Sequence, residues 1–492
     1  MSSGFDKGQS LATSAKQISQ PPRSSPRDSI SSHARRPVLF GICLVIALIV
    51  AAWLRPDQSL SPAAVRALFI LVLAVLLWAT EVIPAFAVGL LVIALNVALL
   101  GRPQGVFAQH DKDWEQFVEV FGHPLIWLFF GGFVLAAGME KCGLDRRLAT
   151  RLLRGFGGRY ENVLMALMMA TFLLSLCMSG TATTAMMLAV ASPLLRQCDA
   201  DSNAAKALLL GIAAASIVAG LGSLFSTPPN AIAAAALSSL DPPQVITVLQ
   251  WSMIGFPPAV VISIVLWKFL CWMYPEPDRV FQLETASADA KSPRLADKLR
   301  FVVVLATLIT TVGLWLSSSW HGIPAAAVAL LPPVVFTSTG VLSAKDIRGL
   351  NYDVLFLMAG GLALGHAVTA TGLSHWIVSQ LPLGSLSPLL LAFVMAYATT
   401  ALANFMSATA TANILVPLAI PIAVGAETLV AIAVAFGASC GMCLPVSSPS
   451  NAMVYSTGRL QIRDIVRVGM LVGVLCPLIS VAWLWICLDL IR

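Results

Sequence analysis

The chain has 492 residues, of which 58% are hydrophobic and only 11% are charged, and its mean hydropathy is +0.85. Soluble globular domains contain about a quarter charged residues, so this composition excludes a water-soluble enzyme of several domains and indicates a polytopic membrane protein. The net charge of +6, from 30 Lys and Arg against 24 Asp and Glu, reports orientation in such a protein and does not predict nucleic-acid binding.

The first 37 residues are rich in Ser, Pro, Gln and Arg and show no apolar periodicity. This composition is typical of a disordered tail. The apolar run at 38–54 begins too late for a signal peptide and has no small-residue cleavage site, so we expect it to remain in the membrane. Residues 38–61 are therefore predicted to form an additional first helix and its loop.

Long apolar runs further along the chain predict membrane crossings. Two segments, 161–197 and 385–424, are twice as long as one span but have a polar centre of small residues, which predicts a re-entrant hairpin in each. The predicted fold class is an all-α polytopic membrane protein. Its eleven predicted transmembrane helices are 38–54, 62–80, 83–101, 124–145, 205–239, 250–273, 299–318, 323–341, 353–378, 427–457 and 465–490.

The placement of Lys and Arg predicts the orientation of these crossings. With the N-terminal tail inside the cell, 25 of the 30 Lys and Arg residues fall on the inner side. Converting either hairpin into a full span would scramble this sorting downstream, which favours the re-entrant interpretation. We expect a multi-pass protein of the cell membrane, the inner or plasma membrane, with its N-terminus in the cytoplasm and its C-terminus outside.

Four pairs of motifs recur in the same order at nearly constant separation. The strings GGFVLAAG and GGLALGHA are 229 residues apart, SGTATTAMML and SATATANILV 228, TPPN and SPSN 221, and two IPA strings 240. This duplication predicts repeat 1 at 62–273 and repeat 2 at 299–490, joined by a cytoplasmic linker at 274–298. Each repeat contains five crossings and one hairpin, so the copies have opposite orientations. Inverted repeats are typical of secondary transporters.

Each repeat pairs a hydroxyl-rich hairpin tip with a helix interrupted by proline. The prolines, at 228, 229 and 449, remove backbone donors and free carbonyls that could hold a cation, while exposed helix N-termini favour an anion. The amides of Asn230 and Asn451 can bond the freed backbone. The alternative is an ordinary helix-packing face of small residues. The tip hydroxyls, which can donate to carboxylate or sulfate oxygens without burial of a charge, belong to Ser179, Thr181, Thr183, Ser407, Thr409 and Thr411.

Other residues in the apolar segments give weaker signals. His366 is the only histidine well inside a predicted span, so it is a candidate for proton coupling or, alternatively, a hydrogen-bonded structural residue. Cys440 and Cys443 fit a C-x-x-C pattern without His or carboxylate neighbours, and we interpret them as packing residues. The glycine pairs that begin at Gly131 and Gly360 predict close helix approach.

The duplicated tips SGTATTAMML and NFMSATATANILVP, the breaks STPPNAI and SSPSNAMVYSTG, and the strings WATEVIP and GGLALG resemble the divalent anion:sodium symporter family, which includes di- and tricarboxylate and sulfate carriers. The resemblance extends over residues 62–490. It implies an elevator-type carrier, usually a homodimer, in which a scaffold domain makes the dimer contacts and a transport domain holds both hairpins.

The family's Ser-Asn-Thr signatures fall at 179–181 and 407–409, so the resemblance implies two sodium sites at the tips and broken helices with the anion between them. Gly180 and Ala408 replace the signature Asn, and both amides are missing. This replacement leaves proton coupling, anion exchange or a non-transporting anion sensor as alternatives. The implied sodium ligands are Ser179, Gly180, Thr227, Ser407, Ala408 and Ser448, and the implied substrate ligands are these six with Thr181, Thr409, Pro228 and Pro449.

The leading interpretation is a secondary active transporter that moves a small divalent anion inward with sodium. The expected anion is either sulfate or a dicarboxylate such as succinate. An ion channel is a second class, but channels rarely need inverted repeats with two broken helices around one midplane site. The sequence has no H-E-x-x-H, intramembrane Asp pair or Walker motif, so we predict neither an enzyme nor an ATP-driven pump. We expect no cofactor beyond sodium as coupling ion; the expected partners are the anion, the lipid bilayer and a second copy of the chain.

Overall fold

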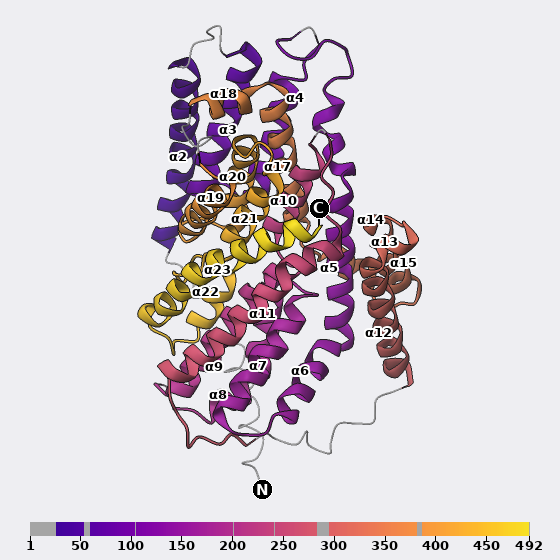
Figure 1. The fold of residues 1–492 in the computed structure, drawn as a ribbon, viewed down its shortest axis with the longest axis vertical. Helices are drawn as coiled ribbons and strands as arrows, with labels where there is room; N and C mark the ends of the chain where they lie inside the picture. Colours follow the sequence, from indigo (N-terminus) through magenta and orange to yellow (C-terminus); the bar gives the residue numbers. More distant parts are fainter. Residues whose placement is uncertain are drawn as a thin grey trace.

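The computed structural model describes residues 26–53, 60–103, 105–199, 201–240, 242–282, 295–380 and 386–491. Within these ranges the secondary structure is helical, and the only β-pairing is an isolated bridge between Arg159 and Val280. The all-α fold class is therefore confirmed (Figure 1).

The helices of the described ranges have the following bounds. In chain order, with η for 3-10 helices, they are α2 (Pro26–Trp53), α3 (Pro62–Thr80), α4 (Ala85–Leu99), η1 (Glu115–Phe117), η2 (Glu119–Gly122), α5 (Pro124–Cys142), α6 (Leu144–Gly155), α7 (Tyr160–Ser175), α8 (Gly180–Arg196), α9 (Asn203–Ala219), η3 (Gly220–Gly222), α10 (Pro228–Ser238), α11 (Val248–Met273), α12 (Leu295–Leu316), α13 (Ser318–His321), α14 (Ala325–Val328), α15 (Leu331–Ser338), α16 (Ala344–Arg348), α17 (Tyr352–Ala370), α18 (Leu373–Gln380), α19 (Pro388–Ala403), α20 (Ala408–Ile422), α21 (Glu427–Ser439), α22 (Pro449–Tyr455) and α23 (Ile462–Ile491).

Eight helices in the described ranges are long and apolar enough to cross a membrane, namely α2, α3, α5, α9 with η3, α11, α12, α17 and α23. The crossing predicted at 83–101 contains only the 15 residues of α4, and that at 323–341 is divided into α14 and α15. The crossings predicted at 205–239 and 427–457 are each divided at their proline, the first into α9 with η3 and α10, the second into α21 and α22. Prolines explain the divisions, because they occupy the first positions of α15 and α22, where the missing N–H is tolerated and a new helix begins.

The first helix begins earlier than the sequence predicts. α2 starts at Pro26, so residues 26–37, assigned to the disordered tail from composition, are helical in the structure. Extending an existing helix is easier than nucleating one, so the apolar part of α2 can propagate helix into the polar segment before it. Residues 1–25 of the predicted tail, residues 283–294 of the predicted linker and the C-terminal Arg492 lie outside the described residues.

The two predicted hairpins and the two interrupted helices have the expected local form. Residues 176–179, the first tip, join α7 to α8, and residues 404–407, the second tip, join α19 to α20; the helices of each pair pack together. The first break, residues 220–227, separates α9 from α10, and the second break, residues 440–448, separates α21 from α22.

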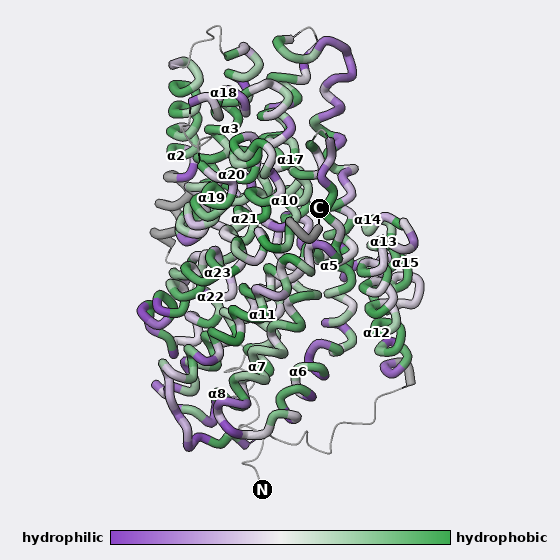
Figure 2. Tube along the Cα trace, viewed as in Figure 1, coloured by the Kyte–Doolittle hydropathy of each residue, from purple (hydrophilic) through white to green (hydrophobic). Residues whose placement is uncertain are grey.

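Elements of the two repeats interlock. α10, which follows the first break, packs against α20 and α21, while α22, which follows the second break, packs against α8 and α9. Figure 1 shows α7, α8 and α9 toward one end of the molecule, α2, α3 and α18 toward the other, and α12 to α15 along one side. Hydrophobic residues run along most helices, and hydrophilic ones gather mainly in the end loops (Figure 2). Each interrupted helix thus contacts the hairpin of the other repeat.

The glycine pairs allow the close helix approach that the sequence predicts. A side-chain carbon on Gly360 in α17 would lie 2.2 Å from the Cα of Gly89 in α4, and one on Gly131 in α5 would lie 2.1 Å from the carbonyl oxygen of Ala329. Both positions lack room for any side chain. The prediction of close approach is confirmed.

Candidate functional site

Both hairpin tips end in a serine that caps the next helix. The Ser179 hydroxyl oxygen accepts a hydrogen bond from the Ala182 N–H at 3.3 Å, and the Ser407 hydroxyl oxygen accepts one from the Ala410 N–H at 3.2 Å. Serine is favoured at this position because its oxygen satisfies an amide that the helix itself leaves free. Each hydroxyl proton stays available to donate to a ligand beside the positive end of the helix dipole.

The residue after each capping serine is the first helical residue, Gly180 or Ala408. A side-chain carbon on Gly180 would lie 3.2 Å from the carbonyl oxygen of Ser216, so glycine lets the first tip approach α9 closely. The hydroxyl-bearing residues that follow differ in exposure: Thr181 is exposed, whereas Thr409 is half-buried.

A buried asparagine braces each break. Asn230 Nδ2 donates hydrogen bonds of 2.7 and 2.8 Å to two carbonyls of the 220–223 segment. Asn451 Nδ2 donates bonds of 2.7 and 3.1 Å to two carbonyls of the 442–444 segment. An unsatisfied buried carbonyl is costly, so these amides stabilise the non-helical shape of both breaks.

The residues before the two proline-led helices have different partners. The Ser448 hydroxyl oxygen caps α22 by accepting from the Asn451 N–H at 3.1 Å. The Thr227 hydroxyl makes no such cap and lies 3.3 Å from the Ser439 hydroxyl, at the end of α21. The first break is therefore in direct contact with the second repeat.

Three buried hydroxyls, the junction hydroxyls, join the first hairpin to both interrupted helices. Thr184 in α8 lies 2.9 Å from Ser216 in α9 and 3.0 Å from Ser450 in α22, and the two serine hydroxyls are 3.1 Å apart. All three side chains are buried. The first hairpin and both interrupted helices therefore meet in one place.

The two tips line separate cavities. Ser179 lines a cavity of about 470 Å³ against α5, where Lys141 forms an ion pair with Asp346. Ser407 lines a cavity of about 330 Å³ beside Glu81, in the turn between α3 and α4. The first hairpin meets both interrupted helices at the junction hydroxyls, whereas Ser407 of the second tip lies beside the turn between α3 and α4.

Three side-chain oxygens at the first break are left without a hydrogen bond in the part of the chain that the structure describes. The buried hydroxyls of Ser175 and Ser223 have no hydrogen-bond partner within the described residues, nor does the side-chain oxygen of Asn230. Ser175 lies against the break, because the Ser226 hydroxyl donates to its carbonyl at 2.6 Å. Hydroxyls and freed carbonyls at an interrupted helix are the neutral ligands that suit sodium in transporters.

His366 lies away from the tips and breaks. It belongs to α17, and its Nε2 is 3.0 Å from Oε1 of Gln116, while its ring packs edge-on against Phe117 with centroids 5.8 Å apart. These contacts belong to the loop before α5. They fit the structural interpretation of this histidine better than a direct contact with the transported anion.

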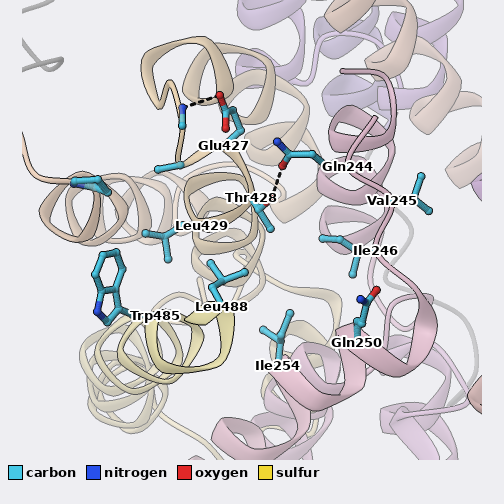
Figure 3. Close-up of a pocket in the computed structure, with 13 residues that line it drawn as sticks. Gln244, Val245, Ile246, Gln250, Ile254, Glu427, Thr428, Leu429, Trp485 and Leu488 are labelled. Atoms are coloured by element: carbon cyan, nitrogen blue, oxygen red, sulfur yellow. Dashed lines mark hydrogen bonds between the residues drawn. The ribbon is translucent and has the colours of Figure 1, made fainter. Parts of the chain in front are cut away.

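A further pocket, of about 360 Å³, lies between the loop before α11, the corner before α21 and the end of α23 (Figure 3). Glu427 accepts a 2.8 Å hydrogen bond from the Gly425 N–H, and the Thr428 hydroxyl donates a hydrogen bond to the side-chain oxygen of Gln244. Gly425 has φ of +79°, a conformation that favours glycine, so the Glu427 carboxylate stabilises a tight corner. None of the tip or break residues lines this pocket.

The cysteines of the C-x-x-C pattern have separate roles. Cys440, at the end of α21, forms a disulfide with Cys476 in α23, and both are fully buried. Cys443 is a free thiol. Cys440 therefore does more than pack, which its spacing in the sequence does not reveal.

Several residues of this region escaped the sequence analysis. Ser175 lies one helical turn before Ser179, and Ser450 lies inside the SPSN motif, so periodicity and motif position were available signals for both. Ser216 and Ser223 stand in runs of apolar and small residues, and no spacing rule distinguishes them. Only the packing of α9 against α8 and α22 makes the position of Ser216 apparent, and only the fold of the first break does so for Ser223.

The family model described as the sodium:sulfate symporter transmembrane region matches residues 37–491. The chain belongs to this family of membrane symporters. The same motifs carried the resemblance found in the sequence, and the match includes both hairpins and both breaks. The prediction of a secondary transporter of this family is therefore confirmed.

Two similar transporters match most of the chain. The sodium-dependent dicarboxylate transporter SdcS of Staphylococcus saprophyticus is 28% identical over 90% of this chain and 88% of its own length. An uncharacterized transporter of Haemophilus influenzae is 30% identical over 92% of this chain and 96% of its own length. Both matches extend over both repeats.

Two solved structures share the fold. The YdaH transporter of Alcanivorax borkumensis superposes with a TM-score of 0.55 at 14% identity and covers 83% of this chain and 99% of its own. MtrF of Neisseria gonorrhoeae gives a TM-score of 0.53 at 14% identity, with 83% and 96% covered. At this identity the likeness supports the fold alone.

Proposed function

We propose that this symporter carries a small divalent anion into the cell together with sodium by alternating access. The anion is either sulfate or a dicarboxylate such as succinate. The observation that carries the proposal is the junction of the first hairpin with both interrupted helices, in a region where several buried hydroxyls have no partner within the described residues. The names of the staphylococcal relatives, sodium-dependent dicarboxylate transporters, support the same substrate class and coupling ion.

The electrostatics of the region favour coupled binding. The segments 176–184, 404–411, 220–230 and 440–451 contain no Asp, Glu, Lys or Arg. A divalent anion that leaves water for such a neutral site needs a compensating charge. A sodium ion about 4 Å away attracts each unit of negative charge by about 4 kcal/mol at an effective dielectric constant of 20. Each ligand therefore raises the affinity of the other by the same factor.

The anion would be held by hydroxyls and helix N-termini. Ser179 and Ser407 keep a free proton beside the N-termini of α8 and α20, and Thr181 and Thr409 supply further hydroxyls. Sodium supplies the positive charge and is held by break and tip oxygens. Because the two tips line separate cavities, contact of both with one anion requires movement of the tips relative to α5 and the turn after α3.

That movement suits an elevator-type cycle, in which the hairpins and interrupted helices move together against a scaffold that forms a homodimer. The positive charges favour a cytoplasmic N-terminus and an outer C-terminus. A cysteine pair that cross-links the hairpin region to α5 should stop uptake while sparing anion binding. Full turnover in the cross-linked protein would contradict the elevator version.

The function is tested by uptake into proteoliposomes. Labelled succinate and labelled sulfate are supplied with an inward sodium gradient, an equal potassium gradient or a pH step. Uptake of one anion that rises with sodium and collapses with a sodium ionophore is the expected result. Uptake driven by the pH step alone would replace sodium by proton coupling or exchange, and binding without uptake would indicate an anion sensor.

A further inference from the structure

The two breaks are related by the internal repeat but differ in their polar atoms. At the hairpin offset of 228, Ser175 corresponds to Ala403, and at the break offset of 221, Ser223 corresponds to Leu444. These two hydroxyls, which have no partner within the described residues, are therefore replaced by apolar side chains in the second repeat.

The second break is also closed by direct packing. A side-chain carbon on Gly441 would lie 2.6 Å from the Cβ of Ala403, so the hairpin rests on the break backbone. In the first repeat the equivalent carbon on Gly220 would meet Thr227 of its own loop, not the hairpin.

The first break also touches its hairpin, since a side-chain carbon on Gly222 would lie 3.1 Å from Leu176. The Ser226 hydroxyl in addition donates to the Ser175 carbonyl. That contact includes the Ser175 hydroxyl, which has no partner within the described residues, whereas Ala403 at the second break offers only a methyl group.

The polar group that remains at the second break is already satisfied. Asn404 Oδ1 accepts from the Cys443 N–H at 2.6 Å, and its Nδ2 donates to the Thr400 carbonyl at 2.8 Å. The threonine hydroxyls in the helices after the tips show the same difference, with a partner in the second repeat and none in the first within the described residues. Thr411 donates to the Ser407 carbonyl at 3.0 Å, whereas Thr183, at the equivalent position in the first repeat, has no partner within the described residues.

We infer that only the first break binds the coupling cation, through the hydroxyls of Ser175 and Ser223 and the adjoining carbonyls, and that the second break is a closed structural element. This inference rests on the proposed sodium coupling. It replaces the two equivalent sites implied by the family resemblance with one site per chain. In the second repeat Asn404 then stabilises the break through its hydrogen bonds, and the cation binds only in the first repeat.

The test is direct sodium binding to the purified full-length protein in lipid nanodiscs, followed by radioactive sodium and by the rise of melting temperature with sodium in place of choline. One sodium per chain with a Hill coefficient near one is expected. Ser175→Ala and Ser223→Ala should each raise the half-saturating sodium concentration about tenfold, because a hydrogen-bonding oxygen facing a charge is lost. If an alanine variant assembles poorly, Ser175→Cys and Ser223→Cys replace it in the test, because cysteine also removes the hydroxyl oxygen but keeps the side-chain size closer to that of serine.

Thr311→Val is the matched control. Thr311 in α12 is also fully buried and has no partner among the residues that the structure describes, but it is far in sequence from either break. Its replacement should leave the sodium response unchanged. Two sodium ions per chain, or binding that survives both serine replacements, would overturn the inference. Single-site sodium binding combined with sodium-independent uptake would uphold the site and refute the proposed coupling instead.

Discussion

Replacement of Asn230 by alanine tests whether the shape of the first break controls cation affinity. The buried amide donates two hydrogen bonds, of 2.7 and 2.8 Å, to carbonyls of the 220–223 segment, and alanine removes both. Hydrogen bonds between side chains inside membrane proteins contribute about 0.6 kcal/mol on average and up to about 1.7 kcal/mol. Loss of two such bonds therefore destabilises the ordered break by about 1–3 kcal/mol. The free energy of sodium binding becomes less favourable by the same amount, because the ion has to order the break as it binds.

At about 1.4 kcal/mol per factor of ten, this cost raises the half-saturating sodium concentration by about 5- to 150-fold. The assay is sodium titration of labelled succinate uptake at saturating succinate. Asn162→Ala is the control, since that exposed amide donates to a single loop carbonyl and should leave the titration unchanged. A half-saturating concentration within twofold of the wild-type value in a correctly assembled Asn230→Ala protein would refute the bracing role.

Three further predictions concern the tips and two titratable groups outside the membrane spans. Thr181→Ala and Thr409→Ala should each raise the half-saturating succinate concentration about threefold to tenfold, through loss of a hydroxyl donor; unchanged values in both would remove these hydroxyls from the site. The Lys141 ammonium holds the pKa of Asp346 well below its usual range, so the ion pair stabilises the fold above the unfolded pKa of about 4 and loses this effect only at lower pH. The melting-temperature difference between wild type and Asp346→Asn should stay constant from pH 8 to pH 5. Burial lowers the pKa of His123, so stability should fall as pH drops below about 6.5, and melting curves of His123→Gln should show a smaller fall.

Local features of the structure could be predicted from the sequence because their causes are local. Pro228 and Pro449 lack an N–H, so each begins a helix wherever its surroundings allow, and α10 and α22 start at these residues. Ser179 and Ser407 cap helices for an equally local reason. Features that depend on packing between distant segments could not be predicted. The hydroxyl of Ser175, which has no partner within the described residues, is one example, and the cavity that each tip lines is another.

The hydrogen bonds among the junction hydroxyls can form only late in biosynthesis, because they join segments that are far apart in the chain. Thr184 and Ser450 are 266 residues apart in the chain, and at a synthesis rate of about 5–20 residues per second the second is made roughly 15–50 s after the first. During that interval the first hairpin is present in the membrane without the hydroxyl from α22. A product that stops after the first repeat never acquires this partner, so the first hairpin reaches its final polar contacts only when translation is nearly complete.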